Sequence, residues 1–189
     1  MYPSLRVALD DAQGLLAQFA SDPCTQKSME AIVEAMVNAI RSGNKILVTG
    51  NGGSMADAMH VAEELSGRFR LDRRPYGAIA LSDPAHMSCV ANDYGYEFVF
   101  SRQVEGLGRR GDVLILLTTS GKSQNLILAA EKAKQAGVVV IGALGGDGGN
   151  LLPLCDLVLM APGRGSDRIQ ELHMLAFHAI IEAVELEVG

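Results

Sequence analysis

The chain has 189 residues, of which 48% are hydrophobic and 20% charged, and its formal net charge is −6. This size favours one α/β domain spanning residues 1–189 with a sizeable core. The negative charge argues against a nucleic-acid surface, no apolar run is long enough to span a membrane, and the early Asp10 and Asp11 argue against a signal peptide. Three cysteines without a Cys-x-x-Cys motif are typical of a reducing compartment, so we expect a cytoplasmic protein. From the charge and the short apolar runs, we expect it to contact neither nucleic acid nor membrane.

Two helices are predicted at the start of the chain. Apolar residues recur at helical spacing over 4–20 and over 24–42, and breaks at 21–23 and 42–44 separate the helices from each other and from the first strand. Two helices before the first strand exceed what an α/β unit needs. We therefore predict that residues 1–43 form a helical arm through which subunits associate, with packing on the chain's own sheet as the alternative.

Strands and helices alternate over residues 44–189, the predicted α/β core. Short, continuously apolar strands are predicted at 45–49, 76–81, 113–117, 138–141 and 157–160. Helices are predicted at 55–68, around His86, and at 96–107, 124–135 and 166–187. Continuously apolar strands alternating with helices are typical of a parallel sheet covered on both faces. The predicted fold is a three-layer α/β/α sandwich with a mainly parallel five-stranded sheet, in which ligands bind beyond the carboxyl ends of the strands.

The first strand runs into the glycine turn at 50–54, and a helix with Met55, Met59, Ala62 and Leu65 along its predicted apolar stripe comes next. Such a turn offers backbone N–H groups to an anion. Asn51 and Ser54 are candidates for holding sugar hydroxyls, and helix capping is the alternative. Met55 stands where a dinucleotide-binding turn requires its last glycine, which argues against a nicotinamide dehydrogenase.

A second turn, at 118–123, carries four hydroxyl groups, those of Thr118, Thr119, Ser120 and Ser123. Hydroxyls and amides at a helix start suit a single phosphate monoester, and plain helix capping is the alternative. The Gly-Lys-Ser sequence at 121–123 resembles the end of a nucleotide-triphosphate loop, but Leu116 replaces its first glycine, which argues against an ATPase.

His60 and Glu64 lie four residues apart and therefore share one helix face. One hypothesis is that they bind a metal ion together with His178, while an ordinary surface or core contact is the alternative. Gln170 is an unusual fourth candidate, about 12 Å from His178 along the final helix. His173 is a rival ligand. We interpret His86 as a structural hydrogen-bonding residue.

Four arginines, Arg68, Arg70, Arg73 and Arg74, come after the first core helix. We interpret them as a solvated or intersubunit surface, and capture of an anionic substrate is the alternative.

Five segments together carry a resemblance to a known family. They are Gly-Asn-Gly-Gly-Ser at 50–54, Asp-Ala-Met-His-x-Ala-Glu-Glu-Leu at 57–65, Cys-Val-x-Asn-Asp-Tyr-Gly at 89–95, Thr-Ser-Gly-x-Ser at 119–123 and Asp-Arg-Ile-Gln-Glu-Leu-His at 167–173. With them the chain closely resembles the phosphoheptose isomerases of the sugar-isomerase (SIS) family. The resemblance implies a flavodoxin-like SIS fold and a homotetramer with sites shared between subunits. Thr118 departs from the family's usual Ser but keeps the hydroxyl, and Met55 replaces a commonly polar residue.

The resemblance also implies the roles of the site residues. Glu64 and His178 are expected to be the catalytic pair. One zinc ion per subunit is expected at His60, Glu64, Gln170 and His178. The residues expected to contact the sugar phosphate are Asn51, Gly52, Gly53, Ser54, Glu64, Asn92, Asp93, Thr118, Thr119, Ser120, Ser123 and Gln170.

The implied reaction interconverts sedoheptulose 7-phosphate and D-glycero-D-manno-heptose 7-phosphate through an enediol, towards the heptose of lipopolysaccharide or capsule. Two alternatives are a non-catalytic SIS protein that binds a DnaA-like partner and a sugar-phosphate sensor. The presence of both Glu64 and His178 favours the isomerase, because a binding protein needs neither an acid nor a base.

Overall fold

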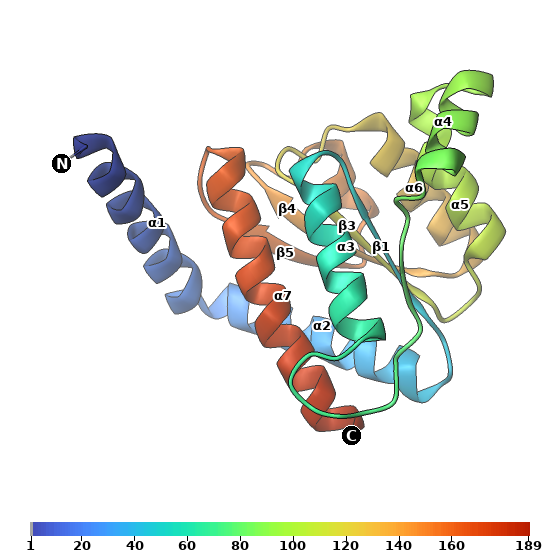
Figure 1. The fold of residues 1–189 in the computed structure, drawn as a ribbon, viewed down its shortest axis with the longest axis horizontal. Coiled ribbons are helices and arrows are strands. Elements are labelled where there is room, and N and C mark those ends of the chain that lie inside the picture. The colour runs from blue at the N-terminus through green and yellow to red at the C-terminus, as the bar shows by residue number, and fades with distance from the viewer. Residues whose placement is uncertain (1) are drawn as a thin grey trace.

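A parallel sheet forms the centre of the computed structural model, which describes residues 2–189 (Figure 1). Its strands in the described chain are β1 (Ile46–Gly50), β2 (Ala78–Ala80), β3 (Val113–Thr118), β4 (Val139–Gly145) and β5 (Leu157–Ala161). The strand order is β2-β1-β3-β4-β5, and every neighbouring pair is parallel. The predicted five-stranded parallel sheet is therefore confirmed.

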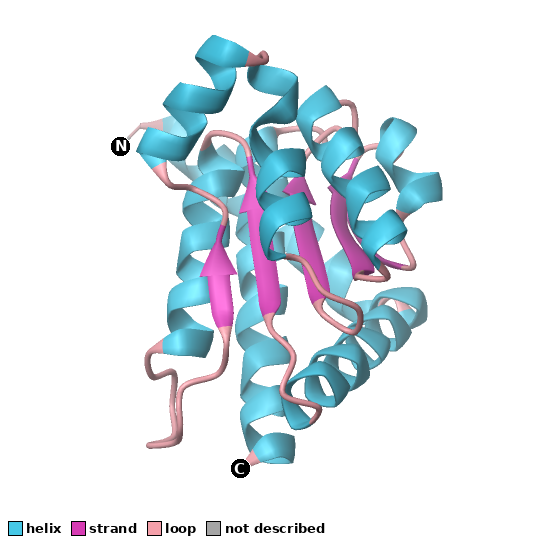
Figure 2. Ribbon diagram, turned by 90° about the vertical axis from the view of Figure 1, so that its right-hand side faces the viewer, coloured by secondary structure: helices cyan, strands magenta, loops and turns pink. Residues whose placement is uncertain are grey.

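Helices cover both faces of this sheet, as Figure 2 shows. On one face pack α2 (Pro23–Arg41), α3 (Gly53–Ser66) and α7 (Ser166–Val188), and on the other α4 (Pro84–Asp93), α5 (Val99–Leu107) and α6 (Gln124–Ala136). Neighbouring strand residues point to opposite faces. Ile46 and Val48 accordingly join the core under α2, α3 and α7, whereas Leu47 joins the core under the other three helices. Two short 3-10 helices, η1 (Tyr96–Phe98) and η2 (Gly149–Leu154), complete the connections.

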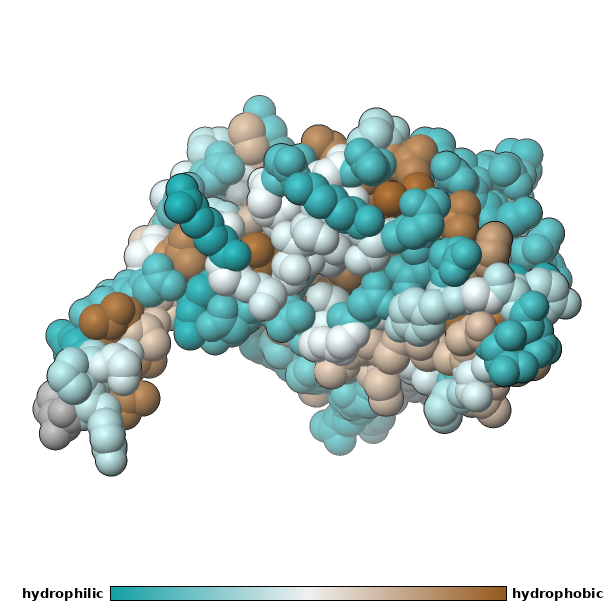
Figure 3. Space-filling view, turned by 90° about the horizontal axis from the view of Figure 1, so that it is seen from above, coloured by the Kyte–Doolittle hydropathy of each residue, from teal (hydrophilic) through white to brown (hydrophobic). Residues whose placement is uncertain are grey.

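The two N-terminal helices have different environments. α1 (Pro3–Ser21) projects from the body, and Leu5 and Leu9 are 61% and 68% exposed. Figure 3 shows apolar side chains on this projecting helix. α2 instead buries Ile32 and Met36 against the chain's own sheet. Packing on the chain's own sheet is therefore confirmed for α2. The end of α1 joins the same core through Phe19, which is 2% exposed, while its first turns leave their apolar residues exposed, so subunit association through α1 stays a prediction.

The sequence misassigned the buried face of α3 and the ends of several elements. Met59 is 52% exposed, because α3 presents Ala58, Val61, Ala62 and Leu65 to the core. Strand β2 is shorter than predicted, and β4 continues to Gly145. The helix around His86 extends through Asp93 and ends before Gly95, whose φ of 110° a helix cannot accommodate. No helix in the described residues is long and apolar enough to cross a membrane.

Candidate active site

The glycine turn and the hydroxyl turn lie side by side. Gly50, the last residue of β1, pairs with Leu117 next to the end of β3, so both turns leave the same edge of the sheet. The chain passes from β1 outwards to β2 and then back across to β3, which makes this edge the topological switch point where α/β sheets bind ligands. Gly52, the N-cap residue just before α3, has a φ of +56°, a conformation that other residues rarely adopt.

An amide pair joins the two turns. The side-chain amides of Asn51 and Asn125 donate to each other's Oδ1 atoms, both at 2.9 Å, and the Tyr96 hydroxyl donates to Asn51 Oδ1 at 3.2 Å. Asn125 is only 4% exposed. Asn125 and Tyr96 were missed from the sequence. The signal available in the sequence was an asparagine near the start of the predicted helix at 124–135, but an amide at a helix start usually caps that helix.

Within the hydroxyl turn, Thr118 has an internal role. Its Oγ1 accepts hydrogen bonds from the backbone N–H groups of Ser120 at 3.4 Å and Gly121 at 3.2 Å, and the residue is 5% exposed. Ser120 is exposed, and Thr119 and Ser123 are half-buried. Thr118 therefore shapes the turn, while Thr119, Ser120 and Ser123 remain at least partly accessible to solvent near the start of α6.

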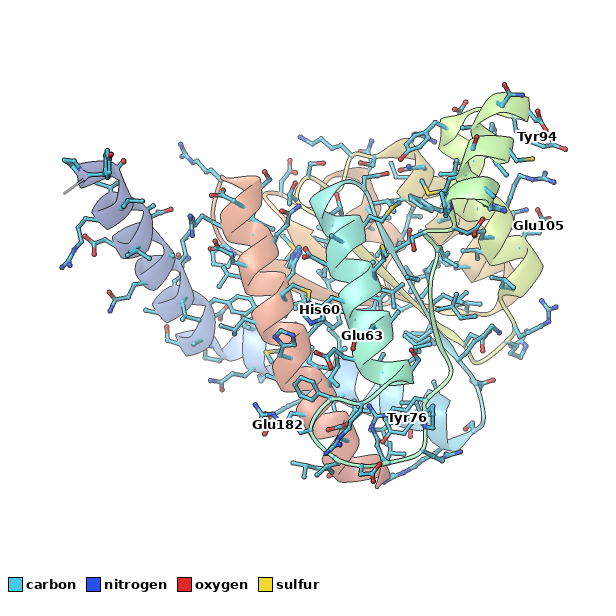
Figure 4. The ribbon with its side chains drawn as sticks, in the orientation of Figure 1. His60, Glu63, Tyr76, Tyr94, Glu105 and Glu182 are labelled. Atoms are coloured by element: carbon cyan, nitrogen blue, oxygen red, sulfur yellow. The ribbon has the colours of Figure 1, made fainter. Side chains whose placement is uncertain are left out.

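An acid–base group forms between α3 and α7. His60 Nε2 lies 3.2 Å from Glu64 Oε1, and the ring centroids of His60 and His178 are 5.0 Å apart. Potential ligand atoms of all three residues lie within 4.8 Å of one another. Figure 4 shows His60 between the two helices. The structure thus brings Glu64 and His178 together within one chain, although one stands early and the other late in the sequence.

Comparison with known proteins places these features in a family. A SIS domain model matches residues 9–145. A phosphoheptose isomerase of Fusobacterium nucleatum is 49% identical over 171 residues, covering 90% of this chain and 88% of its own. A phosphoheptose isomerase structure from Francisella tularensis is 32% identical with a TM-score of 0.93 and covers 97% of each chain. That of Neisseria gonorrhoeae is 34% identical with a TM-score of 0.90, covering 98% of this chain and all of its own.

The chain belongs to the phosphoheptose isomerase family of SIS-domain proteins. The expected fold class is thereby confirmed, because the resemblance extends over nearly the whole chain in both sequence and structure.

The donor atoms of the acid–base group fit a zinc ion in kind and spacing. Two imidazoles and a carboxylate are ordinary zinc ligands, and ligand atoms on a tetrahedral zinc lie about 3.4 Å from one another. The distance between His60 and Glu64 already matches that spacing, and His178 completes a set within 4.8 Å. The Phe69 ring stacks on the His178 ring, with centroids 5.8 Å apart, and so limits its rotation. The group can therefore hold one metal ion with little rearrangement.

Gln170, the predicted fourth ligand, lies at the other end of this helix pair. Its Nε2 donates to Ser54 Oγ at 3.3 Å, and its amide fills the space that a Cβ on Gly53 would need. The structure therefore places Gln170 beside the glycine turn, about 12 Å from His178 along the helix axis. Its metal and substrate roles stay predictions.

Asn92 and Asp93 occupy the exposed end of α4. The Asn92 amide donates to Asp93 Oδ1 at 2.8 Å, and the Cys89 thiol donates to Asp93 Oδ2 at 3.6 Å. These hydrogen bonds stay within α4, so the predicted substrate contacts of Asn92 and Asp93 stay predictions.

The two other histidines are structural. His173 is fully buried, its Nε2 lies 3.3 Å from the carbonyl oxygen of Leu144, and burial lowers its pKa to about 4. It points to the sheet and away from the acid–base group, so it is not the rival ligand that the sequence left open. His86 Nε2 lies 3.1 Å from the carbonyl oxygen of Val99, which confirms its predicted hydrogen-bonding role.

The interpretation of the arginines as a surface was wrong for Arg73. Its side chain is 1% exposed and pairs with Glu185 of the same chain. Arg68 and Arg74 are exposed, as predicted. Arg70 is also exposed, but it pairs with Glu182 on α7.

Proposed function

We propose that this protein is a phosphoheptose isomerase that interconverts sedoheptulose 7-phosphate and D-glycero-D-manno-heptose 7-phosphate. Membership of the family and the similarity to two phosphoheptose isomerase structures support this activity. The single observation that carries the proposal is the position of Glu64 beside His60 and His178. A base and a proton carrier on facing helices are what an aldose–ketose isomerisation requires.

The phosphate of the substrate would bind at the hydroxyl turn. Thr119, Ser120 and Ser123 offer hydroxyls there, and the start of α6 offers backbone N–H groups. The amide pair of Asn51 and Asn125 fixes the neighbouring glycine turn, which would hold sugar hydroxyls.

The spacing along α3 supports a site shared between subunits. Glu64 lies eleven residues beyond Gly53, which is about 16 Å along the helix axis. The reacting carbons of an extended heptose 7-phosphate lie only about 9 Å from its phosphorus, given bonds of roughly 1.5 Å. One chain therefore places its glycine turn, which lies beside the hydroxyl turn, farther from Glu64 along α3 than the reacting carbons lie from the phosphorus. A second subunit, presenting its own acid–base group to these two turns, would close the distance.

Proton transfer would proceed through an enediol. Glu64, whose side chain is 15% exposed, would remove the proton from C1 of the ketose and return it to C2. His178 would carry a proton between the oxygens of C1 and C2. A carboxylate and an imidazole each have two donor atoms, so each can hold a metal with one atom and handle a proton with the other.

His60, Glu64 and His178 would hold one zinc ion per subunit, as their chemistry and spacing support. When bound, zinc supplies Lewis-acid polarisation of the substrate carbonyl. Gln170 is the proposed fourth ligand, which requires its amide to leave Ser54 and the Gln170 and His178 side chains to lean towards each other across about 12 Å of α7.

Homotetramer formation through α1 is the proposed assembly, because α1 leaves Leu5, Val7 and Leu9 exposed on a helix that projects from the body. The proposed location is the cytoplasm, which the three free cysteines support. The product would feed heptose synthesis for lipopolysaccharide or capsule.

Incubation with sedoheptulose 7-phosphate tests the proposal. Aldose 7-phosphate should accumulate to equilibrium, and the reverse reaction should start from the aldose. Binding of the sugar phosphate without aldose formation, at any zinc concentration, would favour the sensor or the partner-binding alternative instead.

A further inference from the structure

A buried ion pair lies beyond the acid–base group, towards the C-terminal ends of α3 and α7. Arg73 belongs to the loop between α3 and β2, and Glu185 to the last turns of α7. Arg73 Nε lies 2.6 Å from Glu185 Oε1, and each side chain is 1% exposed. The sequence pattern predicted neither the burial nor the pairing.

The remaining donors of Arg73 hold the end of α3. Nη2 donates to the carbonyl oxygen of Glu64 at 2.9 Å, and Nη1 donates to that of Leu65 at 3.0 Å. Carbonyl groups in the last turn of a helix lack partners within the helix, and a positive charge there complements the helix dipole. The guanidinium also lies 3.9 Å from the centre of the Tyr76 ring. Figure 4 shows Tyr76 near the lower ends of α3 and α7. Arg73 therefore fixes the backbone of Glu64 itself.

Glu185 holds the loop to the helix that carries His178. Its Oε2 accepts the backbone N–H groups of Arg70 at 3.1 Å and Leu71 at 3.3 Å. Phe69, the residue before Arg70, stacks on the His178 ring. Glu185 lies seven residues beyond His178, two helical turns, so the two side chains leave the same face of α7.

These contacts connect Glu64 and His178 by a continuous path. The path runs from the Glu64 carbonyl through Arg73 and Glu185 to α7, and a branch runs through Phe69 to the His178 ring. Burying two charges carries a desolvation cost that a hydrophobic pair would avoid, so a buried ion pair is weak evidence for stability. The planar guanidinium of Arg73, which makes several hydrogen bonds at once, instead fixes the end of α3 and the loop after it in one position relative to α7.

We propose that Arg73 and Glu185 are positioning residues, which set the distance between Glu64 and His178 that proton transfer and metal binding require. This inference builds on the proposed function and adds two residues that touch neither substrate nor metal.

A matched control exists at the residue just before β3. Asp112 is a buried carboxylate that pairs with Lys45 and accepts the backbone N–H groups of Lys45 at 3.0 Å and Arg109 at 2.8 Å. Like Glu185, it therefore combines one cation with two backbone donors. Asp112→Asn measures the loss of stability that such a change causes at a carboxylate whose partners, Lys45 and Arg109, lie outside the acid–base group.

The experiment compares Glu185→Gln, Arg73→Lys and Asp112→Asn below their melting temperatures, with circular dichroism as the check on folding. Arg73→Lys keeps the charge but cannot reach two carbonyls and a carboxylate together, so it provides a second test if Glu185→Gln does not fold. The readouts are kcat and KM with sedoheptulose 7-phosphate, and Co²⁺ binding monitored by its visible absorption.

Glu185→Gln and Arg73→Lys should each lower kcat and Co²⁺ affinity by about 10- to 100-fold, with KM nearly unchanged. This is the range of effect for residues that orient metal ligands. Asp112→Asn should lower the melting temperature but leave both readouts near those of the parent. If Glu185→Gln and Arg73→Lys lower only the melting temperature, the pair is structural and the inference is overturned. If the parent makes no aldose, the proposed function fails, while the Co²⁺ comparison still decides whether the pair positions the three side chains.

Discussion

The rings of His60 and His178 lie edge to face, with an interplanar angle of 71° and centroids 5.0 Å apart. His60 projects from α3, the helix that follows the first strand, and His178 projects from α7, the last helix of the chain. Glu64 stands one helical turn beyond His60 and completes the group. Two helices on one face of the sheet therefore build a site that no local segment of the sequence contains.

Metal binding should stabilise the folded protein. Zinc at 100 times its dissociation constant should raise the free energy of unfolding by about 2.7 kcal/mol, because the assembled ligand set exists only in the folded state. Thermal denaturation of the metal-free protein with and without zinc measures this effect. His60→Gln should remove most of the stabilisation, whereas His86→Gln, a histidine outside the group, should keep it. An equal stabilisation of both variants would place the metal elsewhere.

Gly121→Ala should damage the hydroxyl turn. A Cβ at Gly121 would lie 1.9 Å from the carbonyl oxygen of Gly148, and the φ of +63° disfavours any side chain. We expect KM for the sugar phosphate to rise by about 10-fold or more, as turn atoms move away from the phosphate. Gly106→Ala, in α5 with open space around the new Cβ, should leave KM unchanged. A normal KM in Gly121→Ala would remove the phosphate from this turn.

The stability of the protein should fall on acidification, partly through His173. Burial lowers the pKa of His173 to about 4, from an ordinary value of 6.5. The unfolded chain therefore binds a proton between pH 6.5 and 4 that the folded chain does not, so this contribution is present above pH 6.5 and is lost as the pH falls towards 4. The total is on the order of 3 kcal/mol.

Urea unfolding at pH 7 and pH 5, at one protein concentration, measures the His173 contribution. His173→Gln should lose roughly 2 kcal/mol less than the parent over this interval. His86→Gln, which removes a comparable histidine–carbonyl contact, serves as the control. Identical pH slopes for His173→Gln and the parent would contradict a neutral, buried His173.

The projecting helix α1 should mediate assembly. Leu5→Glu combined with Leu9→Glu places charges on its exposed apolar residues and should shift the proposed tetramer towards smaller species in analytical ultracentrifugation, with the helical content retained. Gln13→Glu, on an exposed polar residue of the same helix, is the matched control. Unchanged assembly of the double variant would assign the subunit contacts to another surface.

Most of the fold could be predicted from the sequence because the strands are short and continuously apolar. The run from Val113 to Leu117 could only be a strand buried on both faces, and each such run indicated a parallel neighbour. The environments of α1 and α2 could not be predicted, because both carry an apolar stripe and only the tertiary structure shows which stripe meets the sheet. Met59 was misplaced for a similar reason, since Ala58 and Val61 offered a competing face at the same helical period.

The sequence could predict those site residues whose type and spacing alone indicate a chemical role. His60 and Glu64 share a helix face by spacing, and the hydroxyls at 118–123 cluster in the sequence itself. Asn125, Arg73 and Glu185 could not be found that way. Each acts through a partner far along the chain, and an isolated arginine or glutamate resembles an ordinary surface residue until its burial is known.

Proton exchange with solvent tests the central claim most directly. The protein is incubated with sedoheptulose 7-phosphate in D₂O, and the aldose is examined by NMR. If Glu64 transfers the proton through an enediol, the parent should place deuterium at C2 of the aldose, and Glu64→Gln should slow both exchange and turnover by roughly 10²–10⁴-fold while still binding the sugar phosphate. Undiminished exchange and turnover in Glu64→Gln would contradict the account.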